Sequence, residues 1–107
     1  MTTAQVIDPT AEVAYWRENF VTRPYVPPGA TFEDYEPAYR YGVDRFNRYE
    51  GSTFEQAEPH LMRDWRGAKG LSRLTWENAK SATRDSWQHA SYAFERAVSN
   101  NSSTDRG

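Results

Sequence analysis

The clearest pattern along the chain is an arrangement of capping and apolar residues that recurs every 22 positions. Each copy opens with threonine, an aromatic residue and glutamate, at 31–33, 53–55 and 75–77. The positions that follow at helical spacing are mostly apolar or small: Tyr35, Tyr39, Val43 and Phe46; Ala57, Leu61, Trp65 and Ala68; Ala79, Thr83, Trp87 and Ala90. Because this spacing marks one face of a helix, the pattern predicts an all-α fold, a small three-helix bundle built from three 22-residue units over residues 31–98.

Prolines and glycines set the expected bounds of these helices. In the first unit Thr31 caps a single turn over 32–36, Pro37 interrupts the hydrogen bonding, and the main helix runs to about residue 50 before Gly51. Its Gly42 leaves space for a large side chain from a neighbour. The second helix ends near Gly67 or Gly70. The third runs unbroken from 75 or 76 to about 98, and its small inward face predicts that it is the central post against which the others pack.

The two ends of the chain differ from the bundle in composition. Residues 1–9 are polar and predict a disordered N-terminus, and residues 99–107 predict a disordered tail. Residues 10–30 predict a short helix capped by Thr10, then an extended arm containing three prolines. Tyr25 and Val26 of this arm are expected to pin it to the bundle. The alternative is that the arm is a ligand for an aromatic-lined proline groove.

Aromatic residues dominate the expected core. The chain of 107 residues has 4 Trp, 7 Tyr and 5 Phe, and each buried aromatic side chain removes roughly 150–250 Å² from water. The predicted core includes six large side chains: Tyr39, Phe46, Leu61, Trp65, Trp76 and Trp87.

Charge and composition limit the function classes. The net charge is −2, so no strong field attracts nucleic acid or anionic lipid. The charge is nonetheless uneven, because residues 37–73 carry 7 basic and 5 acidic side chains. There is no cysteine, which excludes disulfides and thiolate chemistry. No apolar run approaches a membrane span and the first residues lack the features of a signal peptide, so a cytoplasmic location is expected.

Several segments resemble a known group of proteins. They are Tyr15 to Phe20, Arg23-Pro24-Tyr25, Tyr35 to Gly42, Leu61-Met62-Arg63-Asp64-Trp65 and Trp76 to Trp87. Together they resemble an uncharacterised family of small bacterial proteins that are soluble, helical and suspected of stress-related roles. The resemblance spans about residues 15–90. It implies a bacterial cytoplasmic protein and carries over no catalytic or binding residue.

Candidate chemistry is sparse. His60 and Asp64 stand one helical turn apart, as do Asp85 and His89, so two helices could in principle combine into a metal site. Such pairs also arise by chance on solvated helices, and the Glu-x-x-His pairs of di-iron bundles are absent. No phosphate-binding loop or Ser/His/Asp pattern is present. We therefore expect no enzyme activity, no metal and no cofactor.

Arginine and tyrosine supply the candidate binding residues. Arginine outnumbers lysine 11 to 2, and Tyr41, Arg45 and Arg48 follow helical spacing on a face predicted to lie away from the core. Arg63 and Arg84, each followed by aspartate, could bind an acidic or phosphorylated partner. The structural alternative is that these Arg and Asp residues pair across helices beside the Trp rings.

Two functions follow from this pattern. The first is a cytoplasmic protein-interaction or scaffolding module whose partner is another protein or a second copy. The second is a nucleic-acid-binding module that uses Arg and Tyr of the basic middle segment. The net charge of −2 favours the first.

Overall fold

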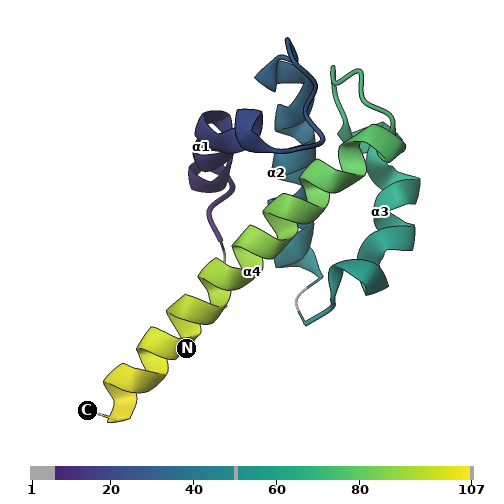
Figure 1. Ribbon diagram of the computed structural model, residues 1–107. Coiled ribbons are helices and arrows are strands. Elements are labelled where there is room, and N and C mark those ends of the chain that lie inside the picture. Colours follow the sequence, from purple (N-terminus) through teal and green to yellow (C-terminus); the bar gives the residue numbers. More distant parts are fainter. Residues whose placement is uncertain (1–6, 50, 107) are drawn as a thin grey trace.

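The computed structural model describes residues 7–49 and 51–106, and over these ranges it contains helices and loops without strands. The chain forms α1 (Pro9–Asn19), the short 3-10 helix η1 (Phe20–Thr22), α2 (Phe32–Arg48), α3 (Phe54–Ala68) and α4 (Trp76–Arg106), as Figure 1 shows. The prediction of an all-α fold is confirmed. None of the described helices is both long enough and apolar enough to cross a membrane.

Local capping chemistry explains where the helices begin. Thr53 caps α3 in a reciprocal box: its hydroxyl accepts from the Gln56 backbone, and the Gln56 side chain accepts from the Thr53 backbone. Thr31 and Thr75 hold the corresponding places before α2 and α4. For α1 the predicted cap is wrong by two residues, because Asp8 accepts from the Thr10 backbone and Pro9 starts the helix. Proline suits that first position, where its missing N–H would have no helical partner.

Pro37 lies inside a continuous α2, so the predicted break at this residue is wrong. The proline removes one helical hydrogen bond. Phe32 and Tyr35, on the turn that precedes it, are 6% and 4% exposed. Burial of these two rings holds the first turn in line with the rest of the helix, since the free energy of burying two aromatic side chains exceeds that of one hydrogen bond.

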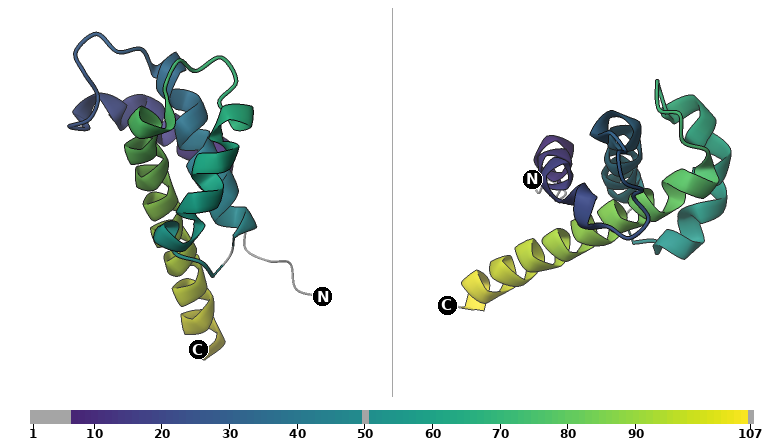
Figure 2. Two further views of the ribbon diagram at one scale, coloured as in Figure 1. Left: turned by 90° about the vertical axis from the view of Figure 1, so that its right-hand side faces the viewer. Right: turned by 45° about the horizontal axis from the view of Figure 1, so that its top comes forward.

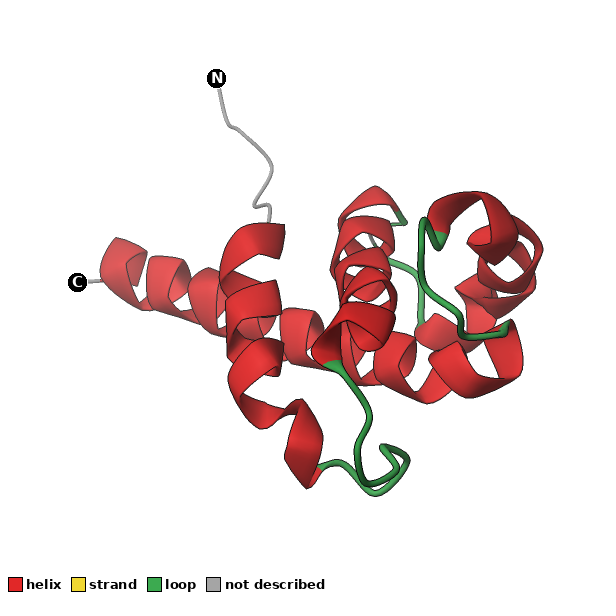
Figure 3. Ribbon diagram, turned by 90° about the horizontal axis from the view of Figure 1, so that it is seen from above, coloured by secondary structure: helices red, strands yellow, loops and turns green. Residues whose placement is uncertain are grey.

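Three helices lie side by side across one face of α4. Seen from above, α2 stands between α1 and α3, and α4 passes beneath all three (Figure 3). Figure 2 shows the same arrangement from two other directions. Because α1 also packs on α2 and α4, the fold is a four-helix globule rather than a three-helix bundle with an appended helix. The prediction that the third-unit helix, α4, is the central one is only partly right. This helix contacts the other three helices, but so does α2.

The contact between α2 and α4 is unusually close at Gly42. A Cβ atom at this position would lie 1.9 Å from Ser86 Oγ and 2.4 Å from the Thr83 carbonyl oxygen. Gly42 therefore accommodates the backbone of α4, not the large side chain that the sequence predicts. Nearby, the Thr83 hydroxyl donates to the Ala38 carbonyl at 3.1 Å. The small-residue face of α4 is what allows this approach.

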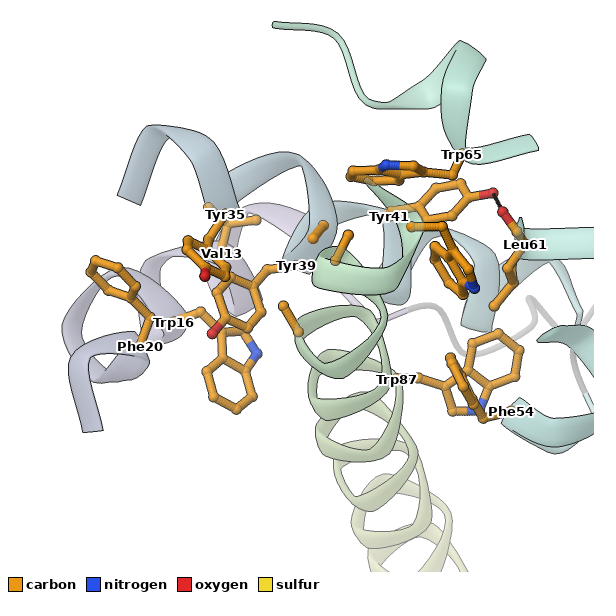
Figure 4. Close-up of a cluster of buried hydrophobic side chains, with 14 of the residues drawn as sticks. Val13, Trp16, Phe20, Tyr35, Tyr39, Tyr41, Phe54, Leu61, Trp65 and Trp87 are labelled. Carbon is orange, nitrogen blue, oxygen red and sulfur yellow. Dashed lines mark hydrogen bonds between the residues drawn. The ribbon is translucent and has the colours of Figure 1, made fainter. Parts of the chain in front are cut away.

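The core is aromatic, as predicted, and extends from α1 to α3 (Figure 4). Five of the six predicted core residues are buried: Tyr39, Leu61, Trp65, Trp76 and Trp87. Phe46 is half-buried and packs edge-on against Trp87. The N-terminal segment adds Val13 and Trp16 of α1 and Phe20 of η1 to the same core.

The two end segments predicted to be disordered are described in part, at residues 7–9 and 99–106. Residues 1–6 lie outside the described part, but Ile7 exchanges two hydrogen bonds with the Asn47 side chain, at 3.0 and 2.9 Å. This pairing satisfies the backbone polar groups of Ile7 and ties the chain to α2. At the other end α4 continues to Arg106, beyond the predicted end near 98. No proline or glycine occurs between 76 and 106, so nothing in the backbone chemistry interrupts the helix.

Candidate interaction surface

Tyr41 is a core residue, so the prediction that it lies on an outward face is wrong. Its side chain is 4% exposed, and its hydroxyl donates to the Leu61 carbonyl at 2.8 Å (Figure 4). Its ring lies 5.4 Å from that of Trp65. Burial raises the pKa of Tyr41 to about 12. The error arises because α3 packs beside α4 on α2, which widens the buried arc of that helix.

Arg45 lies over Tyr41 at the edge of this contact. Its guanidinium carbon is 5.0 Å from the centre of the Tyr41 ring, and its Nε is 3.7 Å from the Asp44 carboxylate. Only 16% of the side chain is exposed. Arg48, near the end of α2, is exposed. The three predicted binding residues of this helix therefore occupy three different environments.

Arg63 and Arg84 each engage a carboxylate. Arg84 crosses from α4 to pair with Glu55 of α3 at 2.6 Å, so it pairs across helices as in the structural alternative, but with a glutamate and not with an aspartate. Arg63 pairs instead with its neighbour Asp64 at 3.1 Å. Since these arginine and acid side chains are largely exposed, each pair contributes little to stability.

Arg23 and Tyr25, on either side of Pro24, form a network that fixes the arm to the bundle. The Tyr25 hydroxyl lies 2.8 Å from the Tyr39 hydroxyl and donates to Asp85 at 2.6 Å. Arg23 donates to the same carboxylate at 2.7 Å. Burial, with the hydrogen bond to Asp85, raises the pKa of Tyr25 well above its usual range. The prediction that Tyr25 pins the arm is confirmed.

The four residues considered for a metal site are not assembled into one. Asp85 is bound by Arg23 and Tyr25, and the His89 ring pairs with Glu12. His60 stacks on Tyr49, with ring centres 5.9 Å apart. Among the described residues no group of three or more His, Cys, Asp or Glu side chains could hold a metal ion.

A groove runs along the face of α2 that points away from α4. Its volume is about 670 Å³, and Tyr41 and Arg45 belong to its lining. The complete lining is Pro9, Glu33, Glu36, Pro37, Arg40, Tyr41, Asp44, Arg45, Ala68, Lys69, Gly70 and Leu71. The start of α1 borders it on one side, and the end of α3 with the following loop borders it on the other. Arg48, Arg63 and Arg84 are not part of this lining.

Leu71 is the most exposed large apolar residue of the groove, at 99%. It lies in the loop between α3 and α4, outside the helical pattern on which the sequence analysis depends. The signal for it in the sequence is a leucine between Gly70 and Ser72, where a turn residue is expected. That signal indicates an apolar side chain with no helix face to join.

Comparison with protein-family models, curated proteins and solved structures finds no match to this chain. Inference about function therefore depends on the groove and the charges around it.

Proposed function

We propose that the protein is a small non-catalytic interaction or scaffolding module, and that the α2 groove is its contact surface. The observation that carries this proposal is the groove itself, with apolar and charged side chains in its lining and a fully exposed leucine among them. Its apolar lining includes Pro37, Tyr41 and Ala68. An exposed apolar surface bordered by polar residues is typical of protein contact sites.

The chemistry of the groove favours binding over catalysis. Its lining side chains are aliphatic, aromatic or charged, and Glu36 pairs with Arg40 while Asp44 pairs with Arg45. The Arg45 guanidinium lies over the Tyr41 ring, and the Tyr41 hydroxyl donates to the Leu61 carbonyl. Rigid aromatic and guanidinium groups lose little entropy on docking, which suits them to a contact surface.

The origin and setting of the protein are part of the same proposal. The starts of α2, α3 and α4 are 22 residues apart, at Phe32, Phe54 and Trp76, which supports descent of the three helices from one repeated unit. The motif resemblance supports a bacterial cytoplasmic protein with a stress-related role. In such a setting a non-catalytic helical module would act by holding partners together.

One observation favours nucleic-acid binding as a second candidate. A smaller hollow of about 360 Å³ lies at the end of α3, and its lining includes the cationic Arg66, Lys69 and Arg73 together with Trp65 and Trp76. Cations beside aromatic rings suit single-stranded nucleic acid. Affinity for such a ligand would fall steeply between low and moderate salt, whereas binding in the apolar α2 groove would change little.

Site-specific photo-cross-linking tests the proposed function. Benzoylphenylalanine at position 71 should give covalent adducts in the native cell, because this side chain borders the proposed contact surface. The matched control is position 21, since Val21 is also an exposed apolar residue, at 67%, and does not line the groove. Adducts at neither position, or equally at both, would contradict the proposal.

A further inference from the structure

The geometry points to a second copy of this chain as the occupant of the α2 groove, with Leu71 of each copy seated in the groove of the other. This inference rests on the proposed function, because it assigns a partner to the same surface. It is carried by three observations. Leu71 lies in a loop that is anchored to α2, the groove lies beside this leucine, and two oppositely charged side chains of the same surface have no ion-pair partner.

Leu71 is held out by an ordered loop. Gly70 adopts a φ of +58°, which turns the chain outward before Leu71. After it, Ser72 is 2% exposed and its hydroxyl donates to the Asp34 carbonyl of α2 at 2.6 Å. Arg73 donates to the Asp34 carboxylate at 2.7 Å. Ser72, the residue next to Leu71, thus anchors the loop to α2. Docking of this leucine would therefore cost little conformational entropy.

Leu71 and the groove lie next to each other on one molecule. Leu71 itself lines the groove, together with the apolar or aromatic residues Pro37, Tyr41 and Ala68. In a two-fold contact the same surface of both copies meets, so Leu71 of each copy can enter the groove of the other. Each association would bury two leucines that are otherwise fully in water.

The charges of the surface are self-complementary. Its three acids and three bases balance, and most of them are paired within one copy: Glu36 with Arg40 at 3.3 Å, and Asp44 with Arg45 at 3.7 Å. Among the described residues, Glu33 and Lys69 have no oppositely charged side chain within 4 Å: Glu33 is exposed, and the Lys69 ammonium donates only to the Ser72 carbonyl, at 3.0 Å. Two-fold docking places Lys69 of each copy against the Glu33 edge of the other. The two unpaired charges are then satisfied together.

Sedimentation equilibrium of the full chain over a range of concentrations tests the inference. The parent should form a dimer, and Leu71→Glu should weaken it by roughly 100-fold or more, since two buried leucines are lost per dimer. The control Val21→Glu introduces the same charge at another exposed apolar position and should leave the dimer unchanged. Circular dichroism and thermal unfolding verify that each variant keeps its fold.

A charge exchange makes the test specific. Glu33→Lys and Lys69→Glu should each be monomeric, because each places like charges opposite one another in a homodimer. An equimolar mixture of the two variants should dimerise, since one contact then keeps its original charges and the other has them reversed. A dimer unaffected by all of these changes would overturn the inference.

The outcome also separates this inference from the proposed function. If the parent stays monomeric while benzoylphenylalanine at position 71 captures a different protein, the groove binds a partner and the second-copy assignment is wrong. If the chain neither self-associates nor forms adducts at position 71, both proposals fail.

Discussion

Gly42 sets the distance between the two most extensively packed helices. Because any side chain here would overlap Ser86 Oγ and the Thr83 carbonyl, Gly42→Ala should force α2 and α4 apart. We expect a loss of about 1–3 kcal/mol in the free energy of unfolding, measured by urea titration. The control is Gly67→Ala in α3, where an added Cβ meets nothing within 4 Å. That variant should be unchanged or gain up to about 1 kcal/mol from helix propensity. Equal stability of both variants would show that the two helices separate at no cost.

Buried tyrosines predict a decrease in stability at alkaline pH. Burial raises the pKa of both Tyr39 and Tyr41 to about 12 in the folded state, against about 10 in an unfolded chain. The folded state therefore favours the neutral hydroxyls. Their contribution is fully present below pH ~10 and is lost as the pH rises through ~12.

Tyr41→Phe is the variant that isolates this effect. At pH 7 it should lose about 1 kcal/mol, the net value of one neutral hydrogen bond, here that to the Leu61 carbonyl. Its melting temperature should then fall less between pH 10 and 12 than that of the parent. Tyr92→Phe, at a 66% exposed position, serves as the control and should follow the parent. A parallel fall for the parent and Tyr41→Phe would mean that Tyr41 ionises as freely in the fold as outside it.

The error at Tyr41 shows that residue spacing within one helix does not reveal how many neighbouring helices cover it. A helical wheel assigns one inward face, and for α2 the spacing predicts a face formed by Tyr35, Tyr39 and Val43. The actual helix is covered by α1, α3 and α4, so its buried arc includes Tyr41 as well. Leu71 was missed for the opposite reason, because it belongs to no helix face at all. Which faces are covered depends on contacts between distant segments.

At the scale of elements, helix starts were more predictable than helix ends. The expected starts agree with Phe32, Phe54 and Trp76 because capping involves residues within one turn of each other. Interruptions and ends depended on packing or on the absence of a stop signal. Pro37 is carried inside α2 by the burial of Phe32 and Tyr35, and α4 continues to Arg106. Local chemistry can thus fix where a helix begins, whereas tertiary contacts decide whether it persists.

The α2 groove was only half predictable for the same reason. Tyr41 and Arg45 were selected because their residue types are common at binding sites, and both line the groove. Arg48, Arg63 and Arg84 have the same chemistry but lie elsewhere. Pro9 and Ala68 reach the groove only because α1 and α3 flank α2. A concave surface formed by three separate segments has no signature in any one of them.

At the scale of the whole molecule, α1 and the arm close one side of the core. The Trp16 ring stacks on Tyr39 with centres 4.8 Å apart, and Phe20 packs edge-on against Phe32 at 5.1 Å. The arm then returns across α4 through the network of Arg23, Tyr25 and Asp85. The N-terminal segment is therefore an integral part of the fold.

Deletion of residues 1–28 should for this reason abolish cooperative unfolding. Two large aromatic side chains of this segment, Trp16 of α1 and Phe20 of η1, are each about 95% buried, at 5% and 6% exposure. Each contributes several kcal/mol at about 25 cal/mol per Å², while a domain of this size has a total stability of only about 5–15 kcal/mol. The truncated chain should also bind a hydrophobic dye, because Phe32 and Tyr39 are left exposed. Arg23→Ala separates the two parts of the segment: it removes only a partly exposed ion pair to Asp85 and should cost about 1 kcal/mol. A truncated chain that melts like the parent would show that α2, α3 and α4 form a complete core on their own.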